Sequence, residues 1–164
     1  MKWTIAALAL LGAQAAEAAT PPACITREQV SDATLFILPT LLDAVADKCR
    51  PSLPPRAYLL NGGRTLARRL AATSDQHWAG AKAAVNAFGS GALPDGLSAE
   101  TMRGVMRDMV MTKGLAKLTP ADCARIDDAA EALSPLPPQN IGRLTALLIQ
   151  LGAGEKGKGL NICQ

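Results

Sequence analysis

Histidine and aromatic residues are scarce in this 164-residue sequence. The single histidine, His77, argues against a serine–histidine–aspartate triad and a histidine-rich metal site. Two tryptophans, two phenylalanines and one tyrosine are too few to stack bases or sugars, so no nucleic-acid partner is expected. The motifs C-x-x-C, G-x-S-x-G and H-E-x-x-H are all missing, so no sequence signature indicates a thiol redox pair, a zinc cluster, a serine hydrolase or a metalloprotease.

The sequence also lacks a large excess of charge and any strand-like pattern. Its 17 basic and 14 acidic residues give a net charge of +3, which is too small to indicate a nucleic-acid or acidic partner. No segment alternates apolar and polar residues over the length of a strand. Apolar residues instead recur every three or four positions from Thr26 to Leu151, which predicts an all-α protein.

The first 18 residues have the pattern of a cleaved secretory signal peptide. Lys2 precedes the apolar run "WTIAALALLGA", and "AEA" at 16–18 has the small residues that signal peptidase requires. The run is shorter than the roughly 20 residues of a membrane-spanning helix. Cleavage after Ala18 leaves 164 − 18 = 146 residues, so we expect a periplasmic or secreted protein of one domain.

All four cysteines lie in the mature chain, at Cys24, Cys49, Cys123 and Cys163. An even number of widely spaced cysteines in an exported protein predicts two disulfides. We expect residues 19–151 to form the single helical domain. Residues 152–164 form a flexible tail rich in glycine and lysine, tethered by Cys163.

The predicted architecture is a compact bundle of five or six short helices, orthogonal or up-and-down, cross-linked by the two disulfides. The helices are expected at 26–48, 55–72, 74–88, 98–114, 119–133 and 138–151. The adjacent glycines in "NGG" at 61–63 should split or fray the second. The predicted N-caps are Thr26, Ser74, Ser98 and Thr119.

Each later helix has an apolar face that should be buried. The expected buried residues are Trp78, Ala81, Val85 and Phe88 in the third helix, Met102, Val105, Met106, Met109 and Val110 in the fourth, and Ile141, Leu144, Leu148 and Leu151 in the last.

The stretch "LFILPTLLDAV" at 35–45 is the most apolar part of the mature chain. Asp32, Asp43 and Asp47 fall on one side of a helical projection, which argues against a membrane span. Pro39 falls on the same polar side, so its missing hydrogen bond would face water and the helix could bend around a core. We expect one continuous bent helix, and a break at Pro39 is the alternative.

The length of this first helix constrains the disulfides. Residues 26–48 span about 34 Å as one helix, whereas the Cα atoms of a disulfide lie within about 7 Å of each other. Cys24 therefore cannot pair with Cys49. Alternating helix directions favour Cys24–Cys123 with Cys49–Cys163, and the pairing Cys24–Cys163 with Cys49–Cys123 stays open.

Arg56, Arg64, Arg68 and Arg69 form the densest basic patch. Arg64 and Arg68 lie one helical turn apart, a spacing that can grip a carboxylate, a phosphate or an acidic partner. A solvated helix face is the ordinary interpretation of such a cluster.

Met102, Met106 and Met109 share one predicted helix face. Thioethers bind Cu(I) or Ag(I), but a packed core or an adaptable binding groove explains methionines among valines better. His77 is expected to be an ordinary surface histidine. The adjacent Asp127 and Asp128 should point in different directions and not act together on a substrate.

These features favour a non-enzymatic exported protein without a cofactor, which acts by binding a protein partner in the cell envelope. The alternative is a carrier of a small apolar ligand, in a cavity between the Met102–Met109 face and the first helix. A second alternative is a Cu(I) or Ag(I) binder using the three methionines. An enzyme that uses only Asp, Glu or Arg stays open. No membrane span is expected after signal cleavage.

Overall fold

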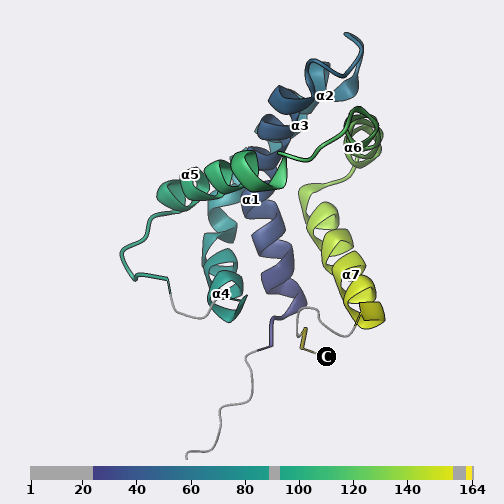
Figure 1. The fold of residues 1–164 in the computed structure, drawn as a ribbon. Helices are drawn as coiled ribbons and strands as arrows, with labels where there is room; N and C mark the ends of the chain where they lie inside the picture. The colour runs from purple at the N-terminus through teal and green to yellow at the C-terminus, as the bar shows by residue number, and fades with distance from the viewer. Residues whose placement is uncertain (1–23, 89–92, 157–161, 164) are drawn as a thin grey trace, which may run out of the picture.

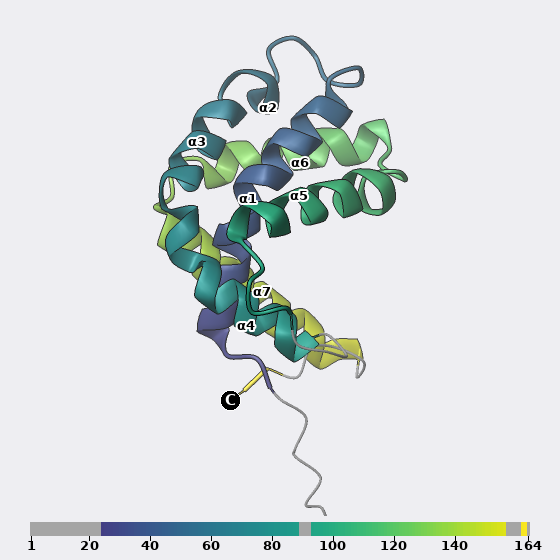
Figure 2. The same ribbon diagram turned by 90° about the vertical axis from the view of Figure 1, so that its left-hand side faces the viewer.

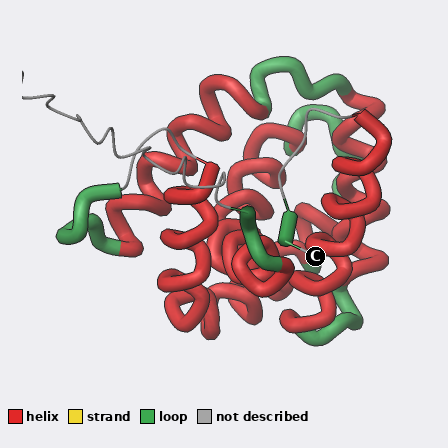
Figure 3. The backbone as a smooth tube through the Cα atoms, turned by 90° about the horizontal axis from the view of Figure 1, so that it is seen from below, coloured by secondary structure: helices red, strands yellow, loops and turns green. Residues whose placement is uncertain are grey.

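The computed structural model describes residues 24–88, 93–156 and 162–163, so the predicted signal peptide lies outside the described residues. The helices are α1 (Arg27–Cys49), α2 (Tyr58–Asn61), α3 (Gly63–Ser74), α4 (Trp78–Phe88), α5 (Ala99–Met109), α6 (Pro120–Leu133) and α7 (Pro138–Lys156). No strand occurs in the described part, which Figure 3 shows as helices joined by loops. The predicted all-α bundle with two disulfides is confirmed.

The central element is α1, and it is one continuous helix. Thr26 caps it as predicted: the Gln29 N–H donates to the Thr26 hydroxyl over 3.1 Å, and the Thr26 N–H donates to the Gln29 side chain over 2.9 Å. The helix runs through Pro39 without a break. In Figure 2 its upper half leans away from its lower half, as expected for a helix bent at an internal proline.

The expectation that Pro39 faces water is wrong, because Pro39 is buried. In Figure 1, α4 lies on one side of α1 and α7 on the other, while α5 crosses in front; Figure 2 shows α3 beside α1 on the side away from α5. Side chains from all sides of α1 are therefore buried, including Val30, Phe36 and Leu42. By length and composition α1 could span a membrane, but 44% of its most apolar window is buried against the rest of the chain.

The glycines at 62 and 63 divide the second predicted helix into α2 and α3. A Cβ atom on Gly62 would lie 2.8 Å from the ring atom Cδ2 of Tyr58, so only glycine lets this ring pack over the junction. The Asp127 carboxylate of α6 accepts the backbone N–H groups of Tyr58 (3.2 Å) and Leu59 (2.7 Å). A carboxylate from another helix thus caps the short α2.

Ser74 does not cap the third helix, which corrects the sequence prediction. It is the buried last residue of α3, and its hydroxyl donates to the Ala71 carbonyl. A 3-10 turn, Asp75–His77, joins α3 directly to α4. The two helices consequently run in the same general direction beside α1, as Figure 2 shows.

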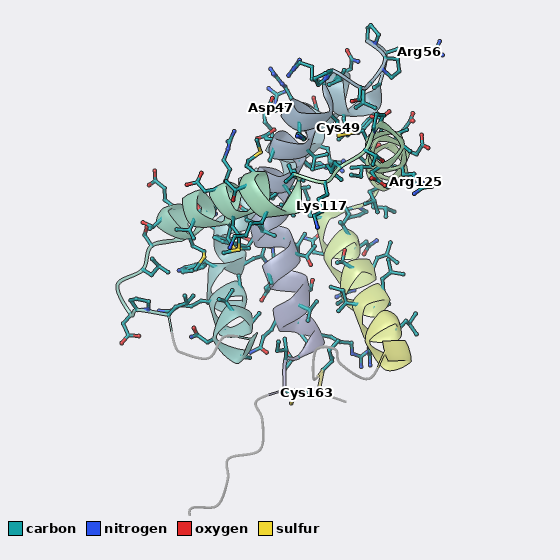
Figure 4. All side chains as sticks on the ribbon, viewed as in Figure 1. Asp47, Cys49, Arg56, Lys117, Arg125 and Cys163 are labelled. Atoms are coloured by element: carbon teal, nitrogen blue, oxygen red, sulfur yellow. A yellow bond between two sulfur atoms is a disulfide. The ribbon has the colours of Figure 1, made fainter. Side chains whose placement is uncertain are left out.

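The disulfides are Cys24–Cys163 and Cys49–Cys123, with Cα–Cα distances of 5.1 and 5.5 Å. The exclusion of Cys24–Cys49 is confirmed, and the favoured pairing is wrong. The prediction counted 55–72 and 74–88 as helices of opposite direction, whereas α3 and α4 form one return path. That error inverts the direction assigned to every later helix. Figure 4 shows Cys49 and Cys163 at opposite ends of α1.

The N-terminus of α6 has the predicted capping box. The Thr119 hydroxyl accepts the Asp122 N–H over 3.2 Å, and the Asp122 carboxylate accepts the Thr119 N–H over 3.0 Å. The Thr119 hydroxyl also donates to this carboxylate, and these bonds lower the pKa of Asp122. The next residue, Cys123, forms the disulfide with Cys49 at the end of α1. The capping box and this disulfide together fix the start of α6 beside α1.

The apolar face predicted for the last helix is wrong at three of its four positions. Ile141 is 1% exposed, but Leu144, Leu148 and Leu151 are 39%, 59% and 71% exposed. The buried side of α7 instead carries Ile141, Gly142 and Ala146, because the helix approaches α1 too closely for larger side chains. A Cβ on Gly142 would lie 3.0 Å from Leu35 Cδ1. The helix also passes Gly152 and ends at Lys156.

The close approach of α4 to α1 can be tested at Gly80, where an added Cβ would lie 2.7 Å from Asp32 Cβ. Gly80→Ala should lower the free energy of unfolding by about 1–3 kcal/mol through overpacking. Gly104→Ala is the control, because nothing lies within 4 Å of that site on α5. It should raise stability by about 0.5–1 kcal/mol.

Urea unfolding of the disulfide-bonded protein, followed by circular dichroism, measures both changes. Equal stabilisation by the two substitutions would contradict the close packing of α4 on α1.

Candidate functional site

The structure does not gather the predicted arginine patch into a site. Arg56, Arg64 and Arg68 are exposed, and Figure 4 shows Arg56 at the outer end of the molecule near α2. Arg69 has a structural contact instead: its guanidinium donates to the backbone carbonyls of Ser134 and Leu136, the latter over 3.2 Å. It thereby joins α3 to the segment that follows α6.

The three methionines of α5 have different surroundings. Met102 is 6% exposed, Met106 is partly buried and Met109 is 52% exposed. The expectation that Val105 and Met109 are buried is wrong, because both are about half exposed and the buried side of α5 is centred on Met102 and Met106. This arrangement gives no support to a three-thioether metal site. The described residues also contain no group of three or more His, Cys, Asp or Glu side chains that could hold a metal ion.

An apolar cavity of about 280 Å³ lies between α1, α4 and α5, with one side chain from α7. It is located where the carrier hypothesis expects one. We call it the apolar cavity, and its lining is Val30, Ala33, Thr34, Phe36, Ile37, Trp78, Ala81, Ala84, Val85, Met102, Met106 and Ile149. The Thr34 hydroxyl donates to the Val30 carbonyl over 2.9 Å. The lining is therefore a nearly uniform hydrocarbon and thioether surface.

The apolar cavity follows from the mixture of small and large residues around it. Ala33 of α1 and Ala81 and Ala84 of α4 contribute only methyl groups. Phe36 and Trp78 are large, and their ring centroids lie 5.0 Å apart. Ser98 caps α5 as predicted, accepting the Thr101 N–H over 3.1 Å. This cap fixes the start of α5, and Met102 lies in the first turns of the helix that follow it.

Arg103 connects α5 to α1 and to the end of α3 beside the cavity. Its guanidinium lies 4.5 Å from the centre of the Phe36 ring, a cation–π contact. It donates to the Ser74 hydroxyl over 3.0 Å and forms an ion pair with Asp75. The sequence gives no local signal for this role, because the partners Phe36, Ser74 and Asp75 lie 28 or more positions away.

His77 is not an ordinary surface histidine. Its side chain is 17% exposed, and Nδ1 lies 2.7 Å from Oδ1 of Asp32 on α1. The two residues are 45 positions apart, so no local spacing could reveal the pair. Asp127 caps α2 while its neighbour Asp128 is exposed, so these adjacent carboxylates do not converge.

No protein-family model, curated protein or solved structure matches this chain.

The role of Arg103 can be tested by Arg103→Ala. The substitution removes a cation–π contact and charge-assisted hydrogen bonds, and it should lower the free energy of unfolding by about 1–2 kcal/mol. Arg107→Ala is the control on the same helix, since Arg107 is half exposed and lies 3.8 Å from Asp47. Its effect should stay within about 0.5 kcal/mol.

Thermal or urea unfolding measures both variants. Equal stability of the two would show that Arg103 does not fasten α5.

Proposed function

We propose that this protein is an exported carrier or sensor that binds a small apolar ligand, or the apolar part of a larger one, in the apolar cavity. One observation carries the proposal: the 280 Å³ space between α1, α4 and α5 has an almost wholly apolar lining. The two disulfides fit an exported protein. The signal-like residues 1–18 extend this to the periplasm or the extracellular space.

The size of the cavity limits the ligand. Apolar cavities of about 150 Å³ already bind benzene in proteins, and this one has a volume of about 280 Å³. A single aromatic ring or a short alkyl chain would fit. Larger molecules would leave their remaining part in solvent.

The chemistry of the lining also favours such a ligand. Met102 and Met106 are unbranched and adjust their shape easily, so they can close around rings or chains of different width. Phe36 and Trp78 provide aromatic surface beside them. Each ligand carbon atom that leaves water for this surface adds to affinity through the hydrophobic effect.

A protein partner in the cell envelope is the second candidate function. The observation that favours it is the row of exposed leucines on α7, namely Leu144, Leu147, Leu148 and Leu151. Contiguous exposed apolar side chains commonly mark an interaction surface. A pull-down from envelope extract should lose its specific partner when Leu148 and Leu151 become aspartate, and retain it when the exposed Met111 becomes aspartate.

The carrier proposal is tested by filling the apolar cavity. Met106→Trp places a large ring in it, and binding of the fluorescent probe N-phenyl-1-naphthylamine should weaken by about tenfold or more. Met109→Trp is the matched control on the same helix, because Met109 is half exposed and outside the lining. Its probe affinity should equal that of the parent protein. Fluorescence titration of the mature, disulfide-bonded protein gives both values.

Two results would reject the proposal: an absence of saturable probe binding, or equal loss of binding in both tryptophan variants. Circular dichroism spectra of the variants show whether each retains the helical fold.

A further inference from the structure

A second, larger cavity of about 570 Å³ lies on the opposite side of α1. It is bordered by the first turns of α1, by the 3-10 turn at Asp75–His77 and by α7. We call it the polar cavity, because five of its ten lining residues are ionisable: Arg27, Glu28, Asp32, His77 and Arg143. It shares no lining residue with the apolar cavity.

The His77–Asp32 pair gives this cavity an oriented imidazole. A carboxylate only accepts hydrogen bonds, so the contact of 2.7 Å places a proton on His77 Nδ1. In the neutral ring, Nε2 then keeps its lone pair. No described side chain forms a hydrogen bond with Nε2. Because His77 lines the cavity, Nε2 is available for a hydrogen bond with a ligand.

Two glycines make room for the polar side chains of α1. Gly80 of α4 faces Asp32, where an added Cβ would collide with the carboxylate. Gly142 of α7 faces Ser31, where an added Cβ would collide with the hydroxyl. Glycine inside a helix costs about 1 kcal/mol relative to alanine, so both helices lose stability at the positions where these polar groups lie between them.

Two arginines border the cavity from different helices. Arg27 begins α1 and Arg143 lies on α7, and neither forms an ion pair with a described residue. Glu28 is the one cavity carboxylate that no described hydrogen bond or ion pair engages, since Asp32 bonds to His77. Guanidinium groups bind carboxylate and phosphate with two parallel hydrogen bonds. Within the described residues, two guanidinium groups without an ion-pair partner outnumber the one free carboxylate, so the cavity favours an anionic ligand.

Part of the lining is apolar. Leu35 of α1 and Ala146 and Leu147 of α7 form this part of the cavity wall, and Ser31 and Gln139 add two uncharged polar side chains. A hydrated inorganic ion gains nothing from such a surface, whereas the carbon part of an organic anion is stabilised by it. The chemistry of the cavity consequently combines an oxyanion group with a few carbon atoms.

We propose that the polar cavity is a binding site for a small organic anion. Arg143 holds the oxyanion, with Arg27 as the second cation, and His77 Nε2 forms a hydrogen bond with the ligand. The carbon part lies against Leu35 and Leu147. A carboxylate and a phosphate monoester satisfy this chemistry equally, and the experiment separates them.

The single histidine makes the test direct, since the imidazole resonances of a tag-free protein can only belong to His77. Benzoate and phenyl phosphate are titrated separately into the mature, disulfide-bonded protein, and the His77 Nε2 and ring-proton shifts are recorded by NMR. We expect a saturable shift with at least one of them. The tighter of the two identifies the headgroup that the cavity accepts.

Three variants locate the site. Arg143→Gln should weaken binding by about tenfold or more, because it removes the charge-assisted hydrogen bonds. Arg64→Gln, which changes an exposed arginine of α3 outside the lining, should leave it unchanged. Met106→Trp fills the apolar cavity and should also leave it unchanged, so this result is independent of the carrier function.

An absence of saturable shifts with both ligands would overturn the proposal. Unchanged binding by the Arg143→Gln variant would also overturn it. Loss of binding in the Met106→Trp variant would do so too, because it would assign the ligand to the apolar cavity. Equal binding of inorganic phosphate and phenyl phosphate would refute the role of the apolar wall.

Discussion

The enclosure of α1 is the constraint on which the rest of this structure depends. The helix has α4 and α7 on opposite sides, and α3 and α5 cover the two sides between them. Because it is surrounded, its apolar residues need not lie on one stripe, and a polar residue enclosed between helices must find its partner on a neighbouring element. Asp32 does so through His77. The two cavities lie on opposite sides of this one helix, so its residues line both of them.

Local signals in the sequence were sufficient to predict the helices. Thr26, Ser98 and Thr119 are caps whose partners lie three residues ahead, and all three were identified correctly. The length of α1 was also predictable, and it excluded one disulfide pairing. Ser74 failed as a cap because its own backbone is helical, and its hydroxyl bonds to the Ala71 carbonyl and to Arg103 of α5. A contact over 29 positions leaves no trace in local sequence.

Packing faces were less predictable than helices, for a physical reason. The spacing of apolar residues predicts that large ones, such as Leu144, Leu148 and Leu151, lie in the core. Close helix contacts instead bury small residues such as Gly142 and Ala146, because these let two backbones approach. The methionines anticipated part of the apolar cavity, yet Phe36, Trp78 and the alanines of α4 were not assigned to it. The His77–Asp32 pair was missed entirely, since its members belong to different helices.

The two disulfides have a topological consequence for the resistance of the protein to proteolysis. Cys24 is bonded to Cys163 and Cys49 to Cys123, so the second link is nested within the first. Any single cleavage of the backbone between Cys24 and Cys163 leaves two fragments that remain covalently joined. A cut between Cys49 and Cys123, a span that includes the exposed turn at Pro94–Gly96, leaves them joined twice. One proteolytic event therefore cannot separate α1 from the helices that enclose it.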